Sequence, residues 1–243
     1  MKIELETIPV WDALQRHSEC FICDLMAEAQ KDAITFYVGN SVMNPETRVK
    51  VNEHGFCPKH WRMLTAANKP QGVALMSDTY LATTREKGES AINGLLTAKN
   101  TRQAKKAVQA FHSVLESREV GCLVCSAMND RLQRYLYTTS YLWGEDPAFR
   151  EALTESKGFC LHHFSLLLEM GQKALSSSLY PEFVHAMGQL EIANLDRIAK
   201  DVHWMTQKYK SENADKPWNG CEDAHKRVVD KMTGRSRVID PVR

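Results

Sequence analysis

The sequence predicts an all-α protein, and three observations predict it. Apolar residues recur every three or four positions through most of the chain, the spacing of one face of an α-helix. No stretch alternates β-branched and polar residues as a half-buried strand does. The segment after Pro181 keeps helical spacing from Phe183 to Met205, which is far too long for a strand. We therefore expect a helical bundle.

The expected helices follow one another with short connections. Thr7 and Pro9 indicate a helix start, because threonine caps a first turn and proline there loses no hydrogen bond. Pro58 begins another helix after Gly55, a residue that permits the chain to reverse. Gly234 is typical of a helix end. We expect helices over about 7–17, 20–38, 45–52, 58–68, 71–98, 100–118, 122–141, 147–156, from 161 onward, for some 30 residues after 181, and over 221–232.

One short motif occurs twice. Residues 55–60 are Gly-Phe-Cys-Pro-Lys-His and residues 158–163 are Gly-Phe-Cys-Leu-His-His. Each copy lies downstream of a Cys-x-x-Cys pair, at 20–23 and 122–125, with 33 and 34 residues between the half-motifs. Matches outside the motifs, such as prolines at 45 and 147, favour duplication of a unit of about 50 residues.

The motif has the composition of a metal site. Two cysteines three apart at a helix start share one face, and the helix dipole favours their thiolates. A cysteine and a histidine three apart at a second helix start complete a tetrahedron. We expect one closed Cys₃His site within each repeat. The expected ligands are Cys20, Cys23, Cys57 and His60 in the first repeat, and Cys122, Cys125, Cys160 and His163 in the second.

Six residues near this pattern are treated separately. His162 would be the ligand in place of His163 if the helix expected from residue 161 began at a different position. Cys221 has no partner in the pattern and is expected to be a small buried apolar residue. Phe21, Phe56, Phe159 and Phe164 are expected to form a dry shell around the ligands.

The ligand set leaves three interpretations open. Zn²⁺ suits a closed Cys₃His site with a structural role, and is the first choice. A [4Fe-4S] cluster is the alternative, because such clusters are mainly bound by thiolates, and two of them would serve electron transfer or support a metalloenzyme. A thiol-disulfide switch is the third, although it gives no reason for the repeated histidine.

No catalytic motif accompanies the metal motif. The sequence contains no Ser-His-Asp order, phosphate loop or nucleotide fingerprint, so we assign no catalytic residue and no organic cofactor. We expect a structural or accessory binding module rather than a classical enzyme. Its partner, a protein or a small ligand, is not identified by the sequence.

Composition excludes several classes of partner. The formal net charge of +1 gives no basis for nucleic-acid binding, and no apolar run is long enough to span a membrane. The 43% of hydrophobic and 25% of charged residues are those of a soluble protein, and with no leader we expect it in the cytoplasm. The basic residues from Lys226 to Arg243 are expected to be a solvated end.

The expected organisation has three segments that form one compact unit. These are the first repeat at 1–99, the second at 100–179, and C-terminal helices at 180–243 whose long helix braces both repeats.

The motifs also carry a resemblance. With the duplicated Cys-x-x-Cys and Gly-Phe-Cys-x-x-His elements and the closing Glu-Asp-Ala-His-Lys-Arg at 222–227, the sequence resembles a family of bacterial proteins known only as a domain of unknown function. The resemblance covers nearly the whole chain. It implies the eight motif residues as candidate ligands and no activity.

Overall fold

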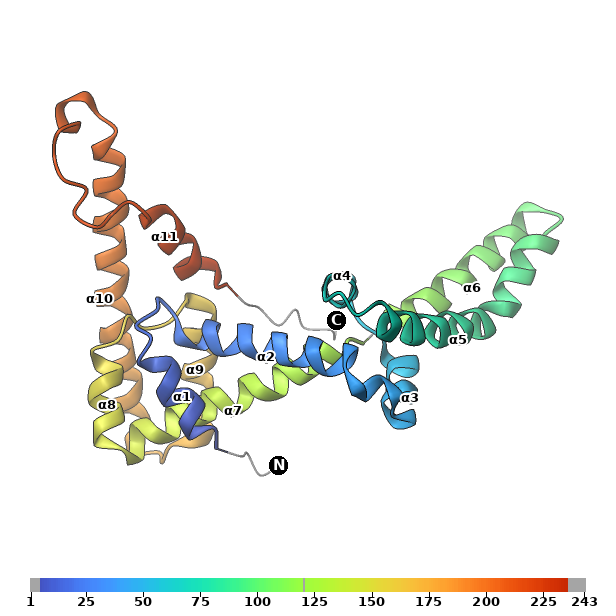
Figure 1. The fold of residues 1–243 in the computed structure, drawn as a ribbon, viewed down its shortest axis with the longest axis horizontal. Helices are drawn as coiled ribbons and strands as arrows, with labels where there is room; N and C mark the ends of the chain where they lie inside the picture. The colour runs from blue at the N-terminus through green and yellow to red at the C-terminus, as the bar shows by residue number, and fades with distance from the viewer. Residues whose placement is uncertain (1–4, 120, 236–243) are drawn as a thin grey trace. The chain divides into compact units, whose positions relative to one another are not determined.

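The computed structural model describes residues 5–119 and 121–235, and that part of the chain is helical without a strand, which confirms the all-α prediction (Figure 1). The helices are α1 (Thr7–Leu14), α2 (Phe21–Val38), α3 (Pro45–His54), α4 (Pro58–Ala66), α5 (Pro70–Thr97), α6 (Thr101–Glu119), α7 (Leu123–Glu145), α8 (Pro147–Thr154), α9 (Leu161–Ala174), α10 (Leu179–Lys208) and α11 (Ala224–Thr233). Two 3₁₀ turns, η1 (Asn40–Met43) and η2 (Ser211–Asn213), lie between them.

Local sequence explains most of the boundaries. α4 begins with Pro58 after Cys57, and α11 ends at Gly234, whose φ is 73°. Asn44 caps α3 through its side chain, as Asp146 caps α8. These ends follow from ordinary capping, in which a side-chain oxygen accepts from a free N–H of the first turn.

Several boundaries differ from the predictions: α1 ends at Leu14 rather than near 17, and α11 begins at Ala224 rather than near 221. The N-cap of α1 is Glu6 rather than Thr7, and no side chain caps it. α7 continues to Glu145, past the predicted end near 141. Leu142 and Trp143 are buried, so the apolar face of α7 continues through its last turn.

The chain folds as two compact units whose boundaries differ from the three expected segments. Of the described residues, unit 1 comprises 5–28 and 130–235, and unit 2 comprises 29–119 and 121–129. α2 begins in unit 1 and ends in unit 2, whereas α7 begins in unit 2 and ends in unit 1.

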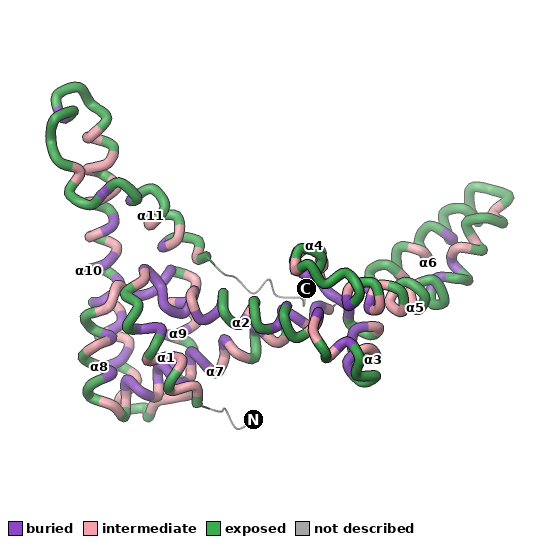
Figure 2. The backbone as a smooth tube through the Cα atoms, viewed as in Figure 1, coloured by how far each residue is buried: buried purple, intermediate pink, exposed green. Residues whose placement is uncertain are grey.

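Unit 1 is built around α10, which packs against α8, α9 and α11. α10 is therefore an element of unit 1, where it packs against α8 and α9 of the second repeat and, through Arg197, binds Glu19 of the first. Phe149, Phe159 and Phe183 are fully buried, and the rings of Trp143 and Phe183 meet edge to face at 5.1 Å. Figure 2 shows the buried positions concentrated where these helices meet.

Unit 2 is built on the hairpin of α5 and α6. α3 packs against both helices of the hairpin, and α4 packs against α5. Within α6 the buried residues are Ala107 and Arg118, so most of this helix lies at the surface (Figure 2). The half of the hairpin near α3 and α4 positions the loop that carries Cys57.

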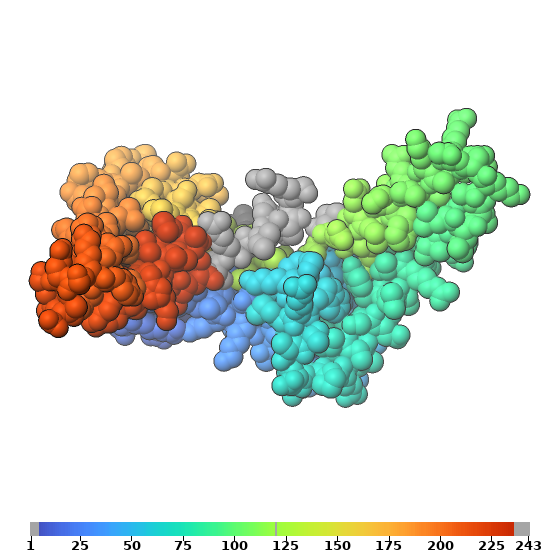
Figure 3. Space-filling model, turned by 90° about the horizontal axis from the view of Figure 1, so that it is seen from above, coloured from blue at the N-terminus to red at the C-terminus, as the bar shows by residue number. Residues whose placement is uncertain are grey.

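The basic residues near the C-terminus are not simply a solvated end. α11 packs against α10 and α9, and it lies beside α10 in Figure 3. The side chain of Lys231 is only 1% exposed, and that of Arg227 is 15% exposed. The prediction was wrong for these two residues because Lys231 lies on the face of α11 that packs against the rest of unit 1, and Arg227 binds Asp201 of α10. Arg237 and Arg243 lie outside the described residues.

None of the described helices combines the length and the hydropathy that crossing a membrane requires.

Candidate metal centres

The eight cysteine and histidine side chains of the repeated motifs come together in two groups of four. In each group the four ligand atoms lie within 4.8 Å of one another. We call the group in unit 1 centre 1 and the group in unit 2 centre 2. Centre 1 consists of Cys20, Cys23, Cys160 and His163, and centre 2 consists of Cys57, His60, Cys122 and Cys125.

The pairing of the motifs differs from the prediction. Each centre combines the Cys-x-x-Cys pair of one repeat with the Cys-x-x-His of the other, so the expected assembly within each repeat was wrong. The cause lies in the fold between the half-motifs. α2 starts in unit 1, with Cys23 in its first turn, and ends in unit 2, where α4 packs on α5 and keeps Cys57. α9 packs on α10 and α11 and keeps Cys160 in unit 1.

Centre 1 is fully buried. Nδ1 of His163 lies 3.4 Å from the Sγ atoms of Cys20 and Cys23 and 3.3 Å from that of Cys160. The Sγ atoms of Cys23 and Cys160 are 3.8 Å apart. Nε2 of His163 is buried without a hydrogen-bond partner among the residues that the structure describes. The imidazole is therefore directed at the three sulfurs through Nδ1.

Centre 2 repeats this arrangement with one more accessible ligand. Nδ1 of His60 lies 3.3 Å from Sγ of Cys57, 3.2 Å from that of Cys122 and 3.3 Å from that of Cys125. Cys57 is half-buried, whereas the other three ligands are buried. The side-chain amide of Gln30 lies 2.9 Å from Nε2 of His60. A ligand histidine is commonly oriented by such a contact on its second nitrogen.

These distances fit a single tetrahedral ion in each centre. With Zn–S near 2.3 Å and Zn–N near 2.0 Å, tetrahedral angles place two sulfurs about 3.8 Å apart and a sulfur and a nitrogen about 3.5 Å apart. The observed sulfur separation in centre 1 is 3.8 Å, and its sulfur-to-nitrogen separations are 3.3 to 3.4 Å. Three thiols and an imidazole around a space of this size are a complete donor set for one ion.

Because the thiols are clustered, their pKa values differ from one another. Hydrogen bonds from Cys160 and then Cys20 lower the pKa of Cys23, while burial raises that of Cys20. In centre 2 the hydrogen bond from Cys125 lowers the pKa of Cys122 to about 3. Each centre therefore already favours one thiolate, which is the form that binds metal.

The histidine of centre 1 responds to the same thiolates. Burial alone lowers the pKa of His163, but hydrogen bonds with Cys160 and Cys23 outweigh it and raise the pKa to about 9. The centre thus attracts positive charge at the position where a metal ion would sit.

Two glycines give the chain its turn before each Cys-x-x-His. Gly55 and Gly158 have φ values of 61° and 71°, in the left-handed region that other residues avoid. A Cβ on Gly55 would lie 2.6 Å from the ring of Tyr80, and one on Gly158 would lie 2.7 Å from a carboxylate oxygen of Glu191. Glu191 also accepts a hydrogen bond of 3.0 Å from the N–H of Phe159.

Two buried cations that the repeated motifs do not predict support the ligand loops. Arg118 of α6, 5% exposed, donates to the carbonyl oxygens of Asn52 at 2.6 Å and Glu53 at 3.4 Å. Lys231 of α11 has a corresponding role in unit 1. The sequence does carry a signal for the burial of Lys231, because this residue lies seven positions after the buried Ala224 and so on the same face of α11.

Two residues near the pattern lie outside both centres. The structure places His163 rather than His162 in centre 1, with the two rings 5.3 Å apart. Cys221 is 3% exposed and belongs to neither group. Of the aromatic residues, Phe21 and Phe159 are buried beside centre 1 with their rings 5.3 Å apart, whereas Phe164 is half-buried.

Comparison with known proteins adds a family without an assigned activity. Residues 1–238 match the family described as "Family of unknown function (DUF6062)". No curated protein and no solved structure gives a significant match.

Proposed function

We propose that this chain, which belongs to that family of unknown function, is a zinc protein with two structural Cys₃His centres. Because the family has no assigned activity, the proposal rests on the two Cys/His groups alone. The observation that supports zinc is the compactness of each group. All four ligand atoms lie within 4.8 Å of one another, the size of the shell around one ion. A closed set of three thiolates and one imidazole leaves no position for substrate, which favours a structural role.

The structural role follows from what each centre joins. Centre 1 ties the start of α2 to the start of α9, and centre 2 ties the start of α4 to the start of α7. In each case the helices are far apart in the sequence. Metal binding of this kind contributes about 10–16 kcal/mol in small zinc domains, so it is folding energy for the unit. On this proposal the units form a scaffold for a protein partner or a small ligand.

A [4Fe-4S] cluster in each centre is the second candidate, because the donor set is rich in thiolates. A four-iron cluster binds each protein ligand at a different iron and so spreads the ligand atoms further apart than one ion does. The sulfur separation of 3.8 Å in centre 1 favours the single ion. The seven cysteines form no disulfide, which favours a reducing compartment, and we propose the cytoplasm.

Elemental analysis of protein purified without oxygen tests the proposal. We expect about two zinc per chain, no iron and no absorbance near 400 nm. Brown protein that contains about eight iron per chain would show that each centre holds a [4Fe-4S] cluster rather than zinc. Protein with neither metal, whose seven thiols all react in the folded state, would overturn both candidates.

A further inference from the structure

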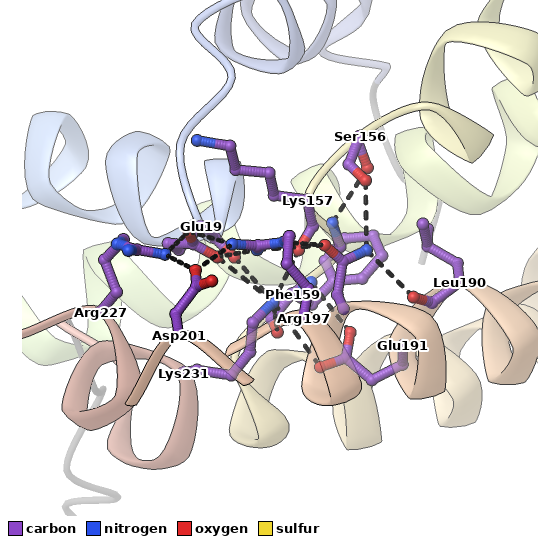
Figure 4. Close-up of polar contacts among 12 residues, drawn as sticks. Glu19, Ser156, Lys157, Phe159, Leu190, Glu191, Arg197, Asp201, Arg227 and Lys231 are labelled. Carbon is purple, nitrogen blue, oxygen red and sulfur yellow. Dashed lines mark hydrogen bonds and ion pairs between the residues drawn. The ribbon is translucent and has the colours of Figure 1, made fainter. Parts of the chain in front are cut away.

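Lys231 joins the two ligand loops of centre 1. Its ammonium group donates to the carbonyl oxygens of Glu19 at 3.1 Å, Lys157 at 2.6 Å and Phe159 at 2.9 Å (Figure 4). Glu19 directly precedes Cys20, and Phe159 directly precedes Cys160. An ammonium group has three donors. All three donate to backbone carbonyl oxygens in the two loops that carry the ligand residues.

Charged partners hold this cation in place although it is buried. Burial lowers the pKa of Lys231, and the carboxylates of Glu191 and Glu19, at 3.8 and 4.0 Å, oppose that effect. Arg197 in turn binds both carboxylate oxygens of Glu19, at 2.6 and 3.1 Å, and Arg227 binds Asp201 at 2.6 Å. These side chains of α10 and α11 fix the position of Lys231 (Figure 4).

The chain beyond α11 then runs against the sulfurs of centre 1. The N–H of Arg235 donates to Sγ of Cys23 at 3.4 Å, and its guanidinium group pairs with Asp24. Gly234 has a φ of 73°, and a Cβ there would lie 3.0 Å from Sγ of Cys160. Only glycine permits this approach. α11 and residues 234–235, which we call the latch, therefore contact both loops and two of the three thiols.

Centre 2 has a different support. Arg118 reaches the carbonyl oxygens of Asn52 and Glu53, which lie before Gly55 rather than beside a ligand cysteine. The N–H of Leu123 donates to the carbonyl oxygen of Gly55 at 3.1 Å and links the two ligand loops. Cys57 is nevertheless half-buried, whereas the other seven candidate ligand residues are buried. Among the ligand residues, Cys57 therefore offers an incoming chelator or thiol reagent the most accessible approach.

We infer that the two centres differ in function: the latch, through Lys231, makes centre 1 a permanent structural site, and centre 2 is the site that exchanges its metal through Cys57. The inference rests on the proposed function. Lys231 is a positioning residue, since it holds the loops and does not touch the ion. A metal ligand exchanges only when an acceptor reaches it, and that approach is open at Cys57 and covered at Cys23 and Cys160.

The order of metal release tests the inference on the unmodified full chain. Protein loaded with two zinc is mixed with excess EDTA and N-ethylmaleimide, released zinc is followed with time, and alkylated cysteines are identified by peptide mass spectrometry. We expect two phases of about one zinc each. Cys57, Cys122 and Cys125 should be labelled in the fast phase, and Cys20, Cys23 and Cys160 in the slow phase.

A pair of matched variants tests the role of Lys231. Removing a residue that supports metal ligands typically costs about 10- to 100-fold in metal affinity, so we expect Lys231→Met to accelerate the slow phase by about that factor and to leave the fast phase unchanged. Lys226→Met removes the same charge from the exposed face of α11 and should change neither phase. In cobalt-loaded protein, Lys231→Met should shift the thiolate-to-cobalt band of one ion to lower energy, because a nearby cation is lost.

Several results would overturn the inference while the zinc proposal stands. These are simultaneous release of both ions, labelling of the centre 1 cysteines first, or equal kinetics in the two lysine variants. If Lys231→Met does not fold, the order of labelling in the unmodified protein decides. Protein that binds no zinc would instead refute the proposed function, and elemental analysis before mixing distinguishes that outcome.

Discussion

The exchange of half-motifs between the centres predicts which combinations of substitutions remove one metal and which remove two. Variant A replaces the four ligands of centre 1, Cys20, Cys23, Cys160 and His163, by alanine. Variant B replaces Cys20, Cys23, Cys57 and His60 instead. Both variants lose three cysteines and one histidine, so each is the control for the other. Variant A leaves centre 2 complete, whereas variant B leaves two ligands in each centre.

The expected magnitude follows from metal binding as folding energy. A structural zinc contributes about 10–16 kcal/mol, comparable with the whole stability of about 5–15 kcal/mol of a typical domain. A centre left with two of its four ligands loses the closed donor set that supplies this energy. We therefore expect such a centre to lose its ion during gel filtration. We expect one zinc per chain in variant A and none in variant B, measured by elemental analysis after gel filtration under reducing conditions. Variant A should also keep a cooperative thermal transition that variant B lacks.

The opposite stoichiometry would refute the pairing. If each repeat built its own centre, variant B would lose only the first and keep one zinc, and variant A would lose both. One zinc in variant B together with none in variant A would therefore show that the half-motifs pair within repeats.

Two further predictions concern the folding role of the centres. Removal of metal with a chelator under reducing conditions should abolish most of the helical circular dichroism signal, and added zinc should restore it, because each ion joins helices distant in sequence; unchanged helicity in protein shown to be free of metal would contradict this. Gly158→Ala should lower stability by about 1–2 kcal/mol or more, since φ is 71° and the new Cβ would lie 2.7 Å from Glu191. Gly188→Ala, where a Cβ meets nothing within 4 Å, is the matched control, and equal melting temperatures of the two variants would show that the turn is not required.

The helices could be predicted from the sequence because their signals are local. Pro58 begins α4 and Gly234 ends α11, as capping preferences require. The eight candidate ligands were also identifiable, because the spacing of three residues at a helix start is a local pattern. Helix starts, helix ends and adjacent ligands all depend on residues within one turn of each other.

The pairing of half-motifs could not be predicted because it is not a local property. The two Cys-x-x-Cys pairs are alike in chemistry, and so are the two Cys-x-x-His motifs, so the residues themselves favour neither combination. The choice is made by packing, since α4 contacts α5 and α9 contacts α10 and α11. Lys231 was missed for a related reason. Its charge suggested solvent, and only the loops of centre 1 provide the three carbonyl oxygens that it binds.

The crossed pairing has a consequence for the halves of the chain. Residues 1–119 contain one ligand pair of each centre, and residues 121–243 contain the other pair of each. Produced separately, neither half can assemble a centre in the arrangement of the whole chain. Mixed with zinc, the halves should associate one to one with two zinc ions, because each ion then bridges both chains. Size-exclusion chromatography with and without zinc measures this, and mixing in EDTA is the control. Separate halves that each elute as a folded monomer with one zinc would contradict the crossed pairing, since each would then have joined its own two motifs.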